Sequence, residues 1–223
     1  MTERLPPPDV SRFPDLTGAH IRALPEGTLF GRIHFTQGDH PSSWNAFRGF
    51  GPTSCRFDHH DGPRGEHPTR AILYAAPVVS DAYGKTVPPL DACLVEVFRD
   101  TGVVDVTRGG PYFALFRISR PIRLLDLADR NWVTVAGGNA AISSGSRSDA
   151  RAWSKAIYEH YSADDLDGLF YGCSNMPRGR SVALYERARS ALSRFPELDL
   201  PLAGPALFGD VEVACSELGL ELI

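Results

Sequence analysis

Apolar residues gather along the chain in short segments that predict β-strands, with Gly, Pro and charged residues between them. Six strands are expected, at residues 28–35, 71–75, 112–118, 122–127, 168–171 and 181–185. The predicted strands outnumber the helices and do not alternate with them regularly. This order favours an α+β fold over a doubly wound parallel sheet.

Two longer segments have helical periodicity. Residues 149–161 form the stronger candidate, with an apolar face made of Trp153, Ala156, Ile157, His160 and Tyr161. A second helix is predicted from Leu90, directly after two prolines. Glu96 lies beside the apolar face of that helix. The alternative, a strand over residues 94–98, would bury Glu96 more deeply.

The predicted organisation is a single domain in three parts. Residues 1–27 form an N-terminal arm, extended and Pro-rich over 5–15, with a short helix at 16–24 that ends near Pro25. Residues 28–190 form the body and contain a long irregular segment, 36–70, of the kind that compact domains keep mainly for functional loops. Residues 191–223 form an acidic C-terminal segment, with a final short helix, packed on the same domain.

The composition is that of an ordinary globular chain, with 223 residues, 43% hydrophobic and 22% charged, which excludes disordered and fibrous classes. The net charge of −4 argues against general nucleic-acid binding. The acidic excess lies in residues 191–223, so an anion site is expected before Arg194. All but two of the 23 basic residues are arginine. Genomic base composition accounts for this excess, or several arginines hold planar anions such as phosphates.

The cysteines and the apolar segments indicate a cytoplasmic protein. The four cysteines are widely spaced, without a C-x-x-C pair. The start of the chain lacks the apolar core of a signal peptide, and the longest uncharged stretch, residues 131–146, is too rich in Gly, Asn and Ser to span a bilayer. We therefore expect reduced thiols and no membrane partner.

Several familiar motifs are incomplete or missing. Gly49-Phe50-Gly51 begins like a dinucleotide fingerprint, but no β-α unit surrounds it, and there is no Walker motif and no G-x-S-x-G motif. A group of potential metal ligands lies within nine residues: His59, His60, Asp61, Glu66 and His67. Adjacent histidines in an extended loop point apart and no H-E-x-x-H accompanies them, so a solvated polar loop is expected and no metal site is predicted.

Three polar residues stand where they could carry chemistry. Arg32 lies inside an apolar strand, where a charged group needs a partner. Glu96 interrupts the apolar run Leu94-Val95-Glu96-Val97-Phe98, and Ser148 directly precedes the strongest helix. Each also has an ordinary explanation, since Arg32 and Glu96 could face solvent and Ser148 suits a helix N-cap.

Taken together, in this order and with their flanking residues, these three resemble the RES family, which is named for an Arg, a Glu and a Ser. The resemblance covers roughly residues 32–187. It is carried by Arg32-Ile33, Gly51-Pro52, Cys55-Arg56-Phe57-Asp58, Ile72-Leu73-Tyr74-Ala75-Ala76, Leu94-Val95-Glu96-Val97-Phe98, Arg123-Leu124-Leu125-Asp126-Leu127, Ser148, Arg151-Ala152-Trp153-Ser154-Lys155-Ala156-Ile157, Asp167-Gly168-Leu169 and Ala183-Leu184-Tyr185-Glu186-Arg187.

The resemblance implies a fold related to ADP-ribosyltransferases, with a mixed, mostly antiparallel sheet, and it implies NAD as the substrate. Cleavage of the nicotinamide–ribose bond passes through an oxocarbenium-like state, which Glu96 would stabilise. Arg32 would hold the pyrophosphate or the ribose, and Ser148 would offer a hydroxyl at a helix N-terminus. For NAD binding the resemblance implies Arg56 as a second anion clamp, Tyr74 packed on nicotinamide, and Phe57, beside Arg56, as a further NAD-binding residue.

Known RES members are bacterial toxins encoded beside an Xre-type antitoxin, so an antitoxin protein is the implied partner, with a homodimer as a further expectation and no direct contact with nucleic acid. Water, phosphate or a cellular protein remains open as the acceptor of ADP-ribose, and a catalytically silent interaction module is the alternative from another class. Two departures stand out. Asp58 replaces the family's Asn after Arg56-Phe57, and residues 78–90 form an insertion between Tyr74 and Glu96.

Overall fold

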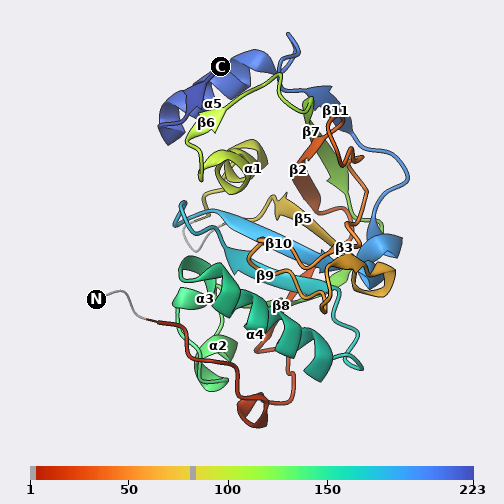
Figure 1. Cartoon of the computed structure of the whole chain (residues 1–223), viewed down its shortest axis with the longest axis vertical. Helices are drawn as coiled ribbons and strands as arrows, with labels where there is room; N and C mark the ends of the chain where they lie inside the picture. The colour runs from red at the N-terminus through yellow and green to blue at the C-terminus, as the bar shows by residue number, and fades with distance from the viewer. Residues whose placement is uncertain (1–3, 81–83) are drawn as a thin grey trace.

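Eight strands form the central sheet of the computed structural model, which describes residues 4–80 and 84–223 (Figure 1). Their order across the sheet is β1-β8-β9-β10-β5-β2-β7-β11. The strands are β1 (Ile21–Leu24), β2 (Leu29–Phe35), β5 (Ile72–Pro77), β7 (Pro111–Arg117), β8 (Ile122–Asp126), β9 (Gly168–Gly172), β10 (Arg180–Tyr185) and β11 (Leu198–Pro201). Neighbours pair antiparallel except β8 and β9, which are parallel. The predicted α+β class, the mostly antiparallel sheet and the six predicted strands are confirmed.

Five α-helices and several short elements surround this sheet in the described residues. The helices are α1 (Pro89–Phe98), α2 (Trp132–Val135), α3 (Ala141–Ser144), α4 (Arg147–His160) and α5 (Phe208–Leu218). The short elements are β3 (Phe50–Gly51), β4 (Gly65–Glu66), β6 (Val103–Val104), β12 (Glu221–Leu222) and the 3-10 turns η1 (Val10–Arg12), η2 (Pro68–Arg70) and η3 (Glu186–Ala191). The segment after Leu90 is a helix, so the alternative strand at 94–98 does not form. Within the described ranges, no helix combines the length and the apolar character that a membrane span requires.

The helix expected at residues 16–24 is wrong, because its second half is strand β1. Ile21 and Leu24 are both buried, and β1 pairs antiparallel with β8 through Ile21↔Leu125 and Leu24↔Ile122. An apolar spacing of three residues also fits a helical face, but here the neighbouring strand supplies the backbone hydrogen-bond partners.

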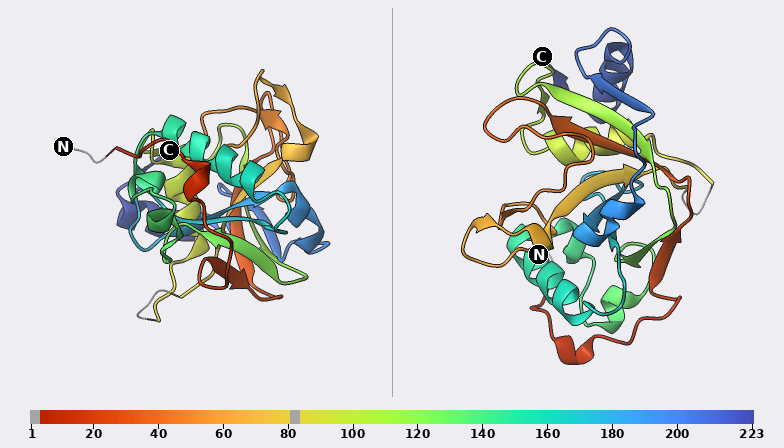
Figure 2. Two further views of the ribbon diagram at one scale, coloured as in Figure 1. Left: turned by 90° about the horizontal axis from the view of Figure 1, so that it is seen from below. Right: turned by 90° about the vertical axis from the view of Figure 1, so that its right-hand side faces the viewer.

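The helices form two layers on different halves of the sheet (Figures 1 and 2). α4, with α2 and α3, packs against the half that contains β8, β9 and β10, around a core that includes Trp132, Trp153, Ile157 and Leu169. α1 packs on β2 and β5, and α5 packs on α1. The helix that carries Glu96 therefore lies between the sheet and the C-terminal helix.

The two ends of the described chain are tied to the body. In the N-terminal segment Leu5 is buried, and the carbonyls of Pro6 and Pro14 accept hydrogen bonds from Trp153 Nε1 and the Tyr161 hydroxyl, both at 2.7 Å. The C-terminal segment adds β11 to the edge of the sheet beside β7 and pairs β12 with β6. Of the insertion at 78–90, residues 81–83 lie outside the described residues, and Ser80 pairs with Thr86 in an isolated bridge.

Gly31 sets how closely α1 approaches the sheet. A Cβ at this position would lie 2.7 Å from Pro89 Cβ and 2.9 Å from the Phe113 ring. We expect Gly31→Ala to push the start of α1 away from β2 and to lower the free energy of unfolding by about 1–3 kcal/mol, the usual cost of overpacking. Denaturant unfolding measures this. Gly209→Ala, at a position where a Cβ meets nothing within 4 Å, is the control, and equal stability of the two variants would contradict the prediction.

Candidate functional site

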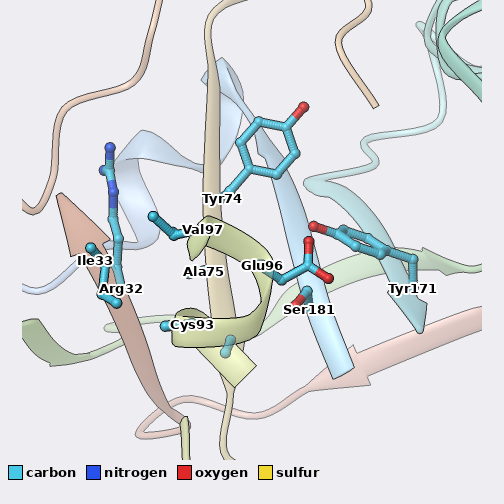
Figure 3. Close-up of a pocket in the computed structure, with 10 residues that line it drawn as sticks. Arg32, Ile33, Tyr74, Ala75, Cys93, Glu96, Val97, Tyr171 and Ser181 are labelled. Carbon is cyan, nitrogen blue, oxygen red and sulfur yellow. The ribbon is translucent and has the colours of Figure 1, made fainter. Parts of the chain in front are cut away.

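The sheet opens between β2 and β5, and the candidate site lies at that opening. The two strands pair at only two positions, Phe30↔Pro77 and Gly31↔Ala76. Beyond them β2 continues along β7, whereas β5 continues along β10. α1 covers the opening and leaves a cavity of about 60 Å³. The cavity is lined by Arg32, Ile33, Tyr74, Ala75, Ala76, Cys93, Glu96, Val97, Tyr171 and Ser181 (Figure 3).

Glu96 projects from the last turn of α1 toward Tyr171 (Figure 3). Glu96 is an exposed residue, but protein atoms crowd around its carboxylate, and the partial loss of hydration raises the pKa of Glu96. Cys173, Arg56 and Tyr171 act in the opposite direction, the thiol and the hydroxyl as hydrogen-bond donors and Arg56 as a positive charge. Desolvation is the larger effect. A carboxylate in such a recess is suited to meeting a positive charge that develops nearby.

Arg32 lines the opposite side of the cavity and is fixed by the irregular segment before β3. Its Nη1 donates to the carbonyl oxygens of Trp44 at 2.8 Å and Ala46 at 2.9 Å. Burial lowers the pKa of Arg32 to about 10, so the side chain still carries its charge at neutral pH. These two carbonyls are the partners that a buried cation in an apolar strand requires.

Arg56 connects the long loop to the start of α4. Its Nη1 donates to the Gly145 carbonyl at 2.7 Å. Burial and the nearby Arg147 lower the pKa of Arg56, while Glu96 raises it. Arg56 is therefore close enough to Glu96 for their charges to influence each other, although Arg56 does not line the cavity.

Phe57 does not line the cavity. It is 0% exposed, and its ring packs against the Tyr171 ring with centroids 4.4 Å apart. The Phe57 carbonyl accepts a hydrogen bond from Ser154 of α4 at 2.8 Å. The expectation that Phe57 binds NAD directly is therefore corrected: its aromatic ring, following Arg56 in the chain, turns into the core and supports Tyr171 from behind.

Asp58 anchors the loop that carries Arg56. The fully buried carboxylate accepts hydrogen bonds from the Thr53 backbone N–H at 2.8 Å and the Thr53 hydroxyl at 2.6 Å. It also pairs with the His60 ring and, at 3.1 Å, with Arg48. Burial alone would raise the pKa of Asp58, but the hydrogen bonds from His60 and Thr53 lower it below the usual range. An acid in place of the family's amide thus has enough donors to stay ionised.

The histidines next to Asp58 are buried, contrary to the solvated loop that we expected. His59 is 0% exposed and its ring stacks on Tyr158 at 4.2 Å, while His60 is 5% exposed. In the described part of the chain, no group of three His, Cys, Asp or Glu side chains is arranged to hold a metal ion. Packing of the loop against α4 and β10 accounts for the burial.

Tyr74 lines the cavity from β5, and its side chain lies between Arg32 and Tyr171 in the close-up view (Figure 3). Its hydroxyl is buried and has no hydrogen-bond partner among the described residues. Burial raises the pKa of Tyr74 well above 10. The side chain therefore remains a neutral phenol with an aromatic surface at the cavity.

Ser148 is not the N-cap of α4, because Ser146 has that position. The Ser146 hydroxyl accepts from the Asp149 backbone N–H at 3.4 Å, and Ser148 lies in the first helical turn. The Ser148 hydroxyl is exposed and lies 2.6 Å from the Ser146 hydroxyl. Ser148 does not line the cavity, although the ion pair of Arg147 with Asp100, at 2.6 Å, brings the start of α4 beside the end of α1.

The two serines can therefore be separated by experiment. We expect Ser146→Ala to lower the free energy of unfolding by about 1 kcal/mol, because it removes the cap. Ser148→Ala should change stability by less than about 0.5 kcal/mol, the usual range for a surface site. Thermal denaturation of both variants gives the comparison. A larger stability loss for Ser148→Ala than for Ser146→Ala would contradict the assignment of the cap.

Tyr171, Cys173, Ser181 and Arg147 belong to the surroundings of Glu96 but were missed as site residues. Tyr171 and Ser181 lie in predicted strands, and they face each other directly in the β9–β10 register. In each strand, a polar group within an otherwise apolar run was the feature of the sequence that could have marked Tyr171 and Ser181 as site residues. The pairing that brings both strands to α1 spans distant parts of the chain, and no local pattern reveals it.

The comparisons with known proteins concern the fold. No protein-family model matches the chain, and no curated protein matches it. Among solved structures, a chain in the crystal structure of the M. tuberculosis MbcT–MbcA toxin–antitoxin complex matches with a TM-score of 0.52. The two chains share a fold. The match covers 92% of this chain and 96% of that chain, at 17% sequence identity. At this identity the likeness shows the fold alone.

Proposed function

We propose that this protein consumes NAD by cleaving the bond between nicotinamide and ribose. The observation that carries the proposal is the position of Glu96, a carboxylate at the opening of the sheet, with Arg32 across the cavity and the positive charge of Arg56 near enough to act on it. The RES resemblance supports the same assignment, since Arg32 and Glu96 are two of the three residues that carry it, with Ser148 as the third. The reaction needs one carboxylate for the ribose and cations for the two phosphates of a dinucleotide.

Glu96 would act on the reacting carbon of the ribose. When the C–N bond breaks, its electron pair leaves with nicotinamide and positive charge develops on the ribose ring. An ionised carboxylate in a partly dry recess stabilises that charge more strongly than it would in water. Water then adds to the same carbon and releases a proton to give ADP-ribose, or phosphate adds to give ADP-ribose phosphate.

The cations around the cavity would hold the rest of the dinucleotide. Arginine forms forked hydrogen bonds with phosphate oxygens, which suits Arg56 and Arg32. The N-terminus of α4, with Ser146 and Ser148, adds backbone N–H groups that favour an anion. Tyr74 offers an aromatic surface for the nicotinamide ring.

The size of the cavity restricts which part of NAD it can enclose. Its volume of about 60 Å³ is well below the roughly 300–1,000 Å³ of pockets that enclose a drug-sized ligand. NAD would therefore place its reacting end over the cavity. The phosphates would extend along the open surface toward Arg56 and the start of α4.

We also propose that the protein is the toxin of a toxin–antitoxin pair. Two observations support this role: the RES resemblance, whose members pair with Xre-type antitoxins, and the fold shared with a chain of a toxin–antitoxin complex. The biological partner would then be an antitoxin protein that limits NAD consumption.

Purified protein incubated with NAD tests the reaction. Samples with and without phosphate, and with and without cell extract, are analysed by mass spectrometry. We expect nicotinamide in every active sample, together with ADP-ribose if water is the acceptor or ADP-ribose phosphate if phosphate is. ADP-ribose attached to an extract protein would instead identify a transferase. NAD that remains intact under all conditions, in protein free of any antitoxin, would overturn the proposed function.

A further inference from the structure

Tyr171 is held more rigidly than the other aromatic residue at the cavity. It is 3% exposed and lies in the middle of the sheet, on β9, directly opposite Ser181 of β10. The Phe57 ring closes its rear side at 4.4 Å. The ring can therefore present its hydroxyl in essentially one direction, and in Figure 3 that direction is toward the Glu96 carboxylate.

The Tyr171 hydroxyl is part of a small polar network at the floor of the cavity. The Ser181 hydroxyl lies 3.1 Å from Cys173 Sγ, and Ser181 is directly opposite Tyr171 in the β9–β10 register. Tyr171 and Cys173 in turn face Glu96 as donors. An ionised carboxylate only accepts hydrogen bonds and a phenol can donate one, so the Tyr171 hydroxyl, which points to the Glu96 carboxylate in Figure 3, is the donor of the pair.

Other charged and titratable groups also face Glu96, and each keeps its own role. They are Arg56 from the long loop, Arg147 from α4, Cys173 directly after β9, Tyr74 from β5 and Cys93 from α1. The two arginines have other partners, since Arg56 donates to the Gly145 carbonyl at 2.7 Å and Arg147 pairs with Asp100 at 2.6 Å. Burial raises the pKa of Cys173 to about 12, so that group remains a neutral thiol. Tyr171 is the hydroxyl donor that the sheet itself fixes in place.

We infer that Tyr171 is a positioning residue for Glu96, and that its hydroxyl holds the carboxylate in one orientation over the cavity. In the free protein the carboxylate would otherwise rotate toward Arg56 or Arg147. With Tyr171 in place, the acceptor oxygens point to where the ribose would lie. The inference rests on the proposed function for its catalytic consequence, but the contact itself can be tested without turnover.

Tyr171→Phe removes only the hydroxyl and keeps the ring that packs on Phe57. Loss of one hydrogen bond to a charged group should lower kcat about 10-fold, with the KM for NAD changed less than about 2-fold because the residue touches Glu96 and not the phosphates. The acid limb of the pH–rate profile should move upward by about one pH unit, since the lost donor favoured the ionised form. Tyr185→Phe, which removes a buried hydroxyl from β10 away from the cavity, should leave all three values unchanged.

A second measurement uses no substrate. The protein is labelled with ¹³C at the glutamate side-chain carboxyl carbons and studied by NMR. The Glu96 signal is identified because it disappears in Glu96→Gln, and its chemical shift is then followed as a function of pH. An upward shift of its midpoint in Tyr171→Phe, absent in Tyr185→Phe, supports the contact. The same midpoint in the wild type and both variants overturns the inference, as does an unchanged pH–rate profile. If wild-type protein leaves NAD intact, the proposed function fails on that result, while the titration still decides the role of Tyr171.

Discussion

Glu96→Gln is expected to lower the rate of NAD consumption at least 100-fold, in the range that removal of one electrostatic or acid–base group produces. Glutamine has nearly the same shape, but it cannot carry the negative charge that would stabilise the developing oxocarbenium ion. The fold should survive the change. Since burial raises the pKa of Glu96, the ionised carboxylate is disfavoured in the native state, and a neutral amide removes that cost.

The measurement combines initial rates with thermal denaturation. Glu212→Gln, on the exposed side of α5, makes the same chemical change far from the cavity and should keep full activity. We expect Glu96→Gln to be at least as stable as the wild type while it loses turnover. Wild-type activity in this variant would place the reacting carboxylate elsewhere.

The elements of this fold could be predicted where local pattern and tertiary contacts agree. The strands that include Arg32, Tyr74 and Tyr171 have apolar runs bounded by Gly, Pro or polar residues, and all of them form. The helix of Glu96 was predicted from its apolar spacing after two prolines, and it begins at Pro89. In each case the face that the pattern makes apolar is the face that the core buries.

Residues 16–24 show where such prediction fails. Their apolar spacing fits a helix, but β8 has an unpaired edge beside them, and backbone pairing with that strand decides the structure. The cap of α4 was misplaced by two residues, since both Ser146 and Ser148 have the hydroxyl that a cap requires and only the backbone geometry distinguishes them.

The arrangement of the candidate site could be predicted from the sequence only in part. Glu96 and Arg56 were selected because of a family resemblance, and in the structure they are close enough for the charge of Glu96 to raise the pKa of Arg56. The orientation of Phe57 could not be derived, because it depends on which way the loop after Cys55 turns. Tyr171 could not be selected either, since its relation to Glu96 arises from the order of β9, β10 and β5 in the sheet.

His59→Phe is expected to remove a large pH dependence of stability. Burial, with a smaller contribution from His60, lowers the pKa of His59 from its ordinary value of 6.5 to about 3 in the folded protein. As the pH falls below 6.5, His59 binds a proton in the unfolded chain but not in the native state. The free energy of unfolding therefore decreases. The loss continues until the native histidine itself titrates near pH 3. Its full size is on the order of 5 kcal/mol.

The informative window is pH 7 to 4.5, above the range in which the lowered pKa of Asp58 makes that carboxylate contribute. Phenylalanine keeps the stacking on Tyr158 and cannot bind a proton. The stability of His59→Phe relative to the wild type should therefore rise by roughly 2–3 kcal/mol between pH 7 and pH 4.5. Urea unfolding at a series of pH values measures the difference, and contributions from Glu96 and other groups present in both proteins cancel.

His160→Phe, which removes an exposed histidine from α4, should follow the wild-type curve. Parallel curves for wild type and His59→Phe would show that the buried imidazole accepts its proton in the native state, and that the packing of the loop against Tyr158 opens readily to water.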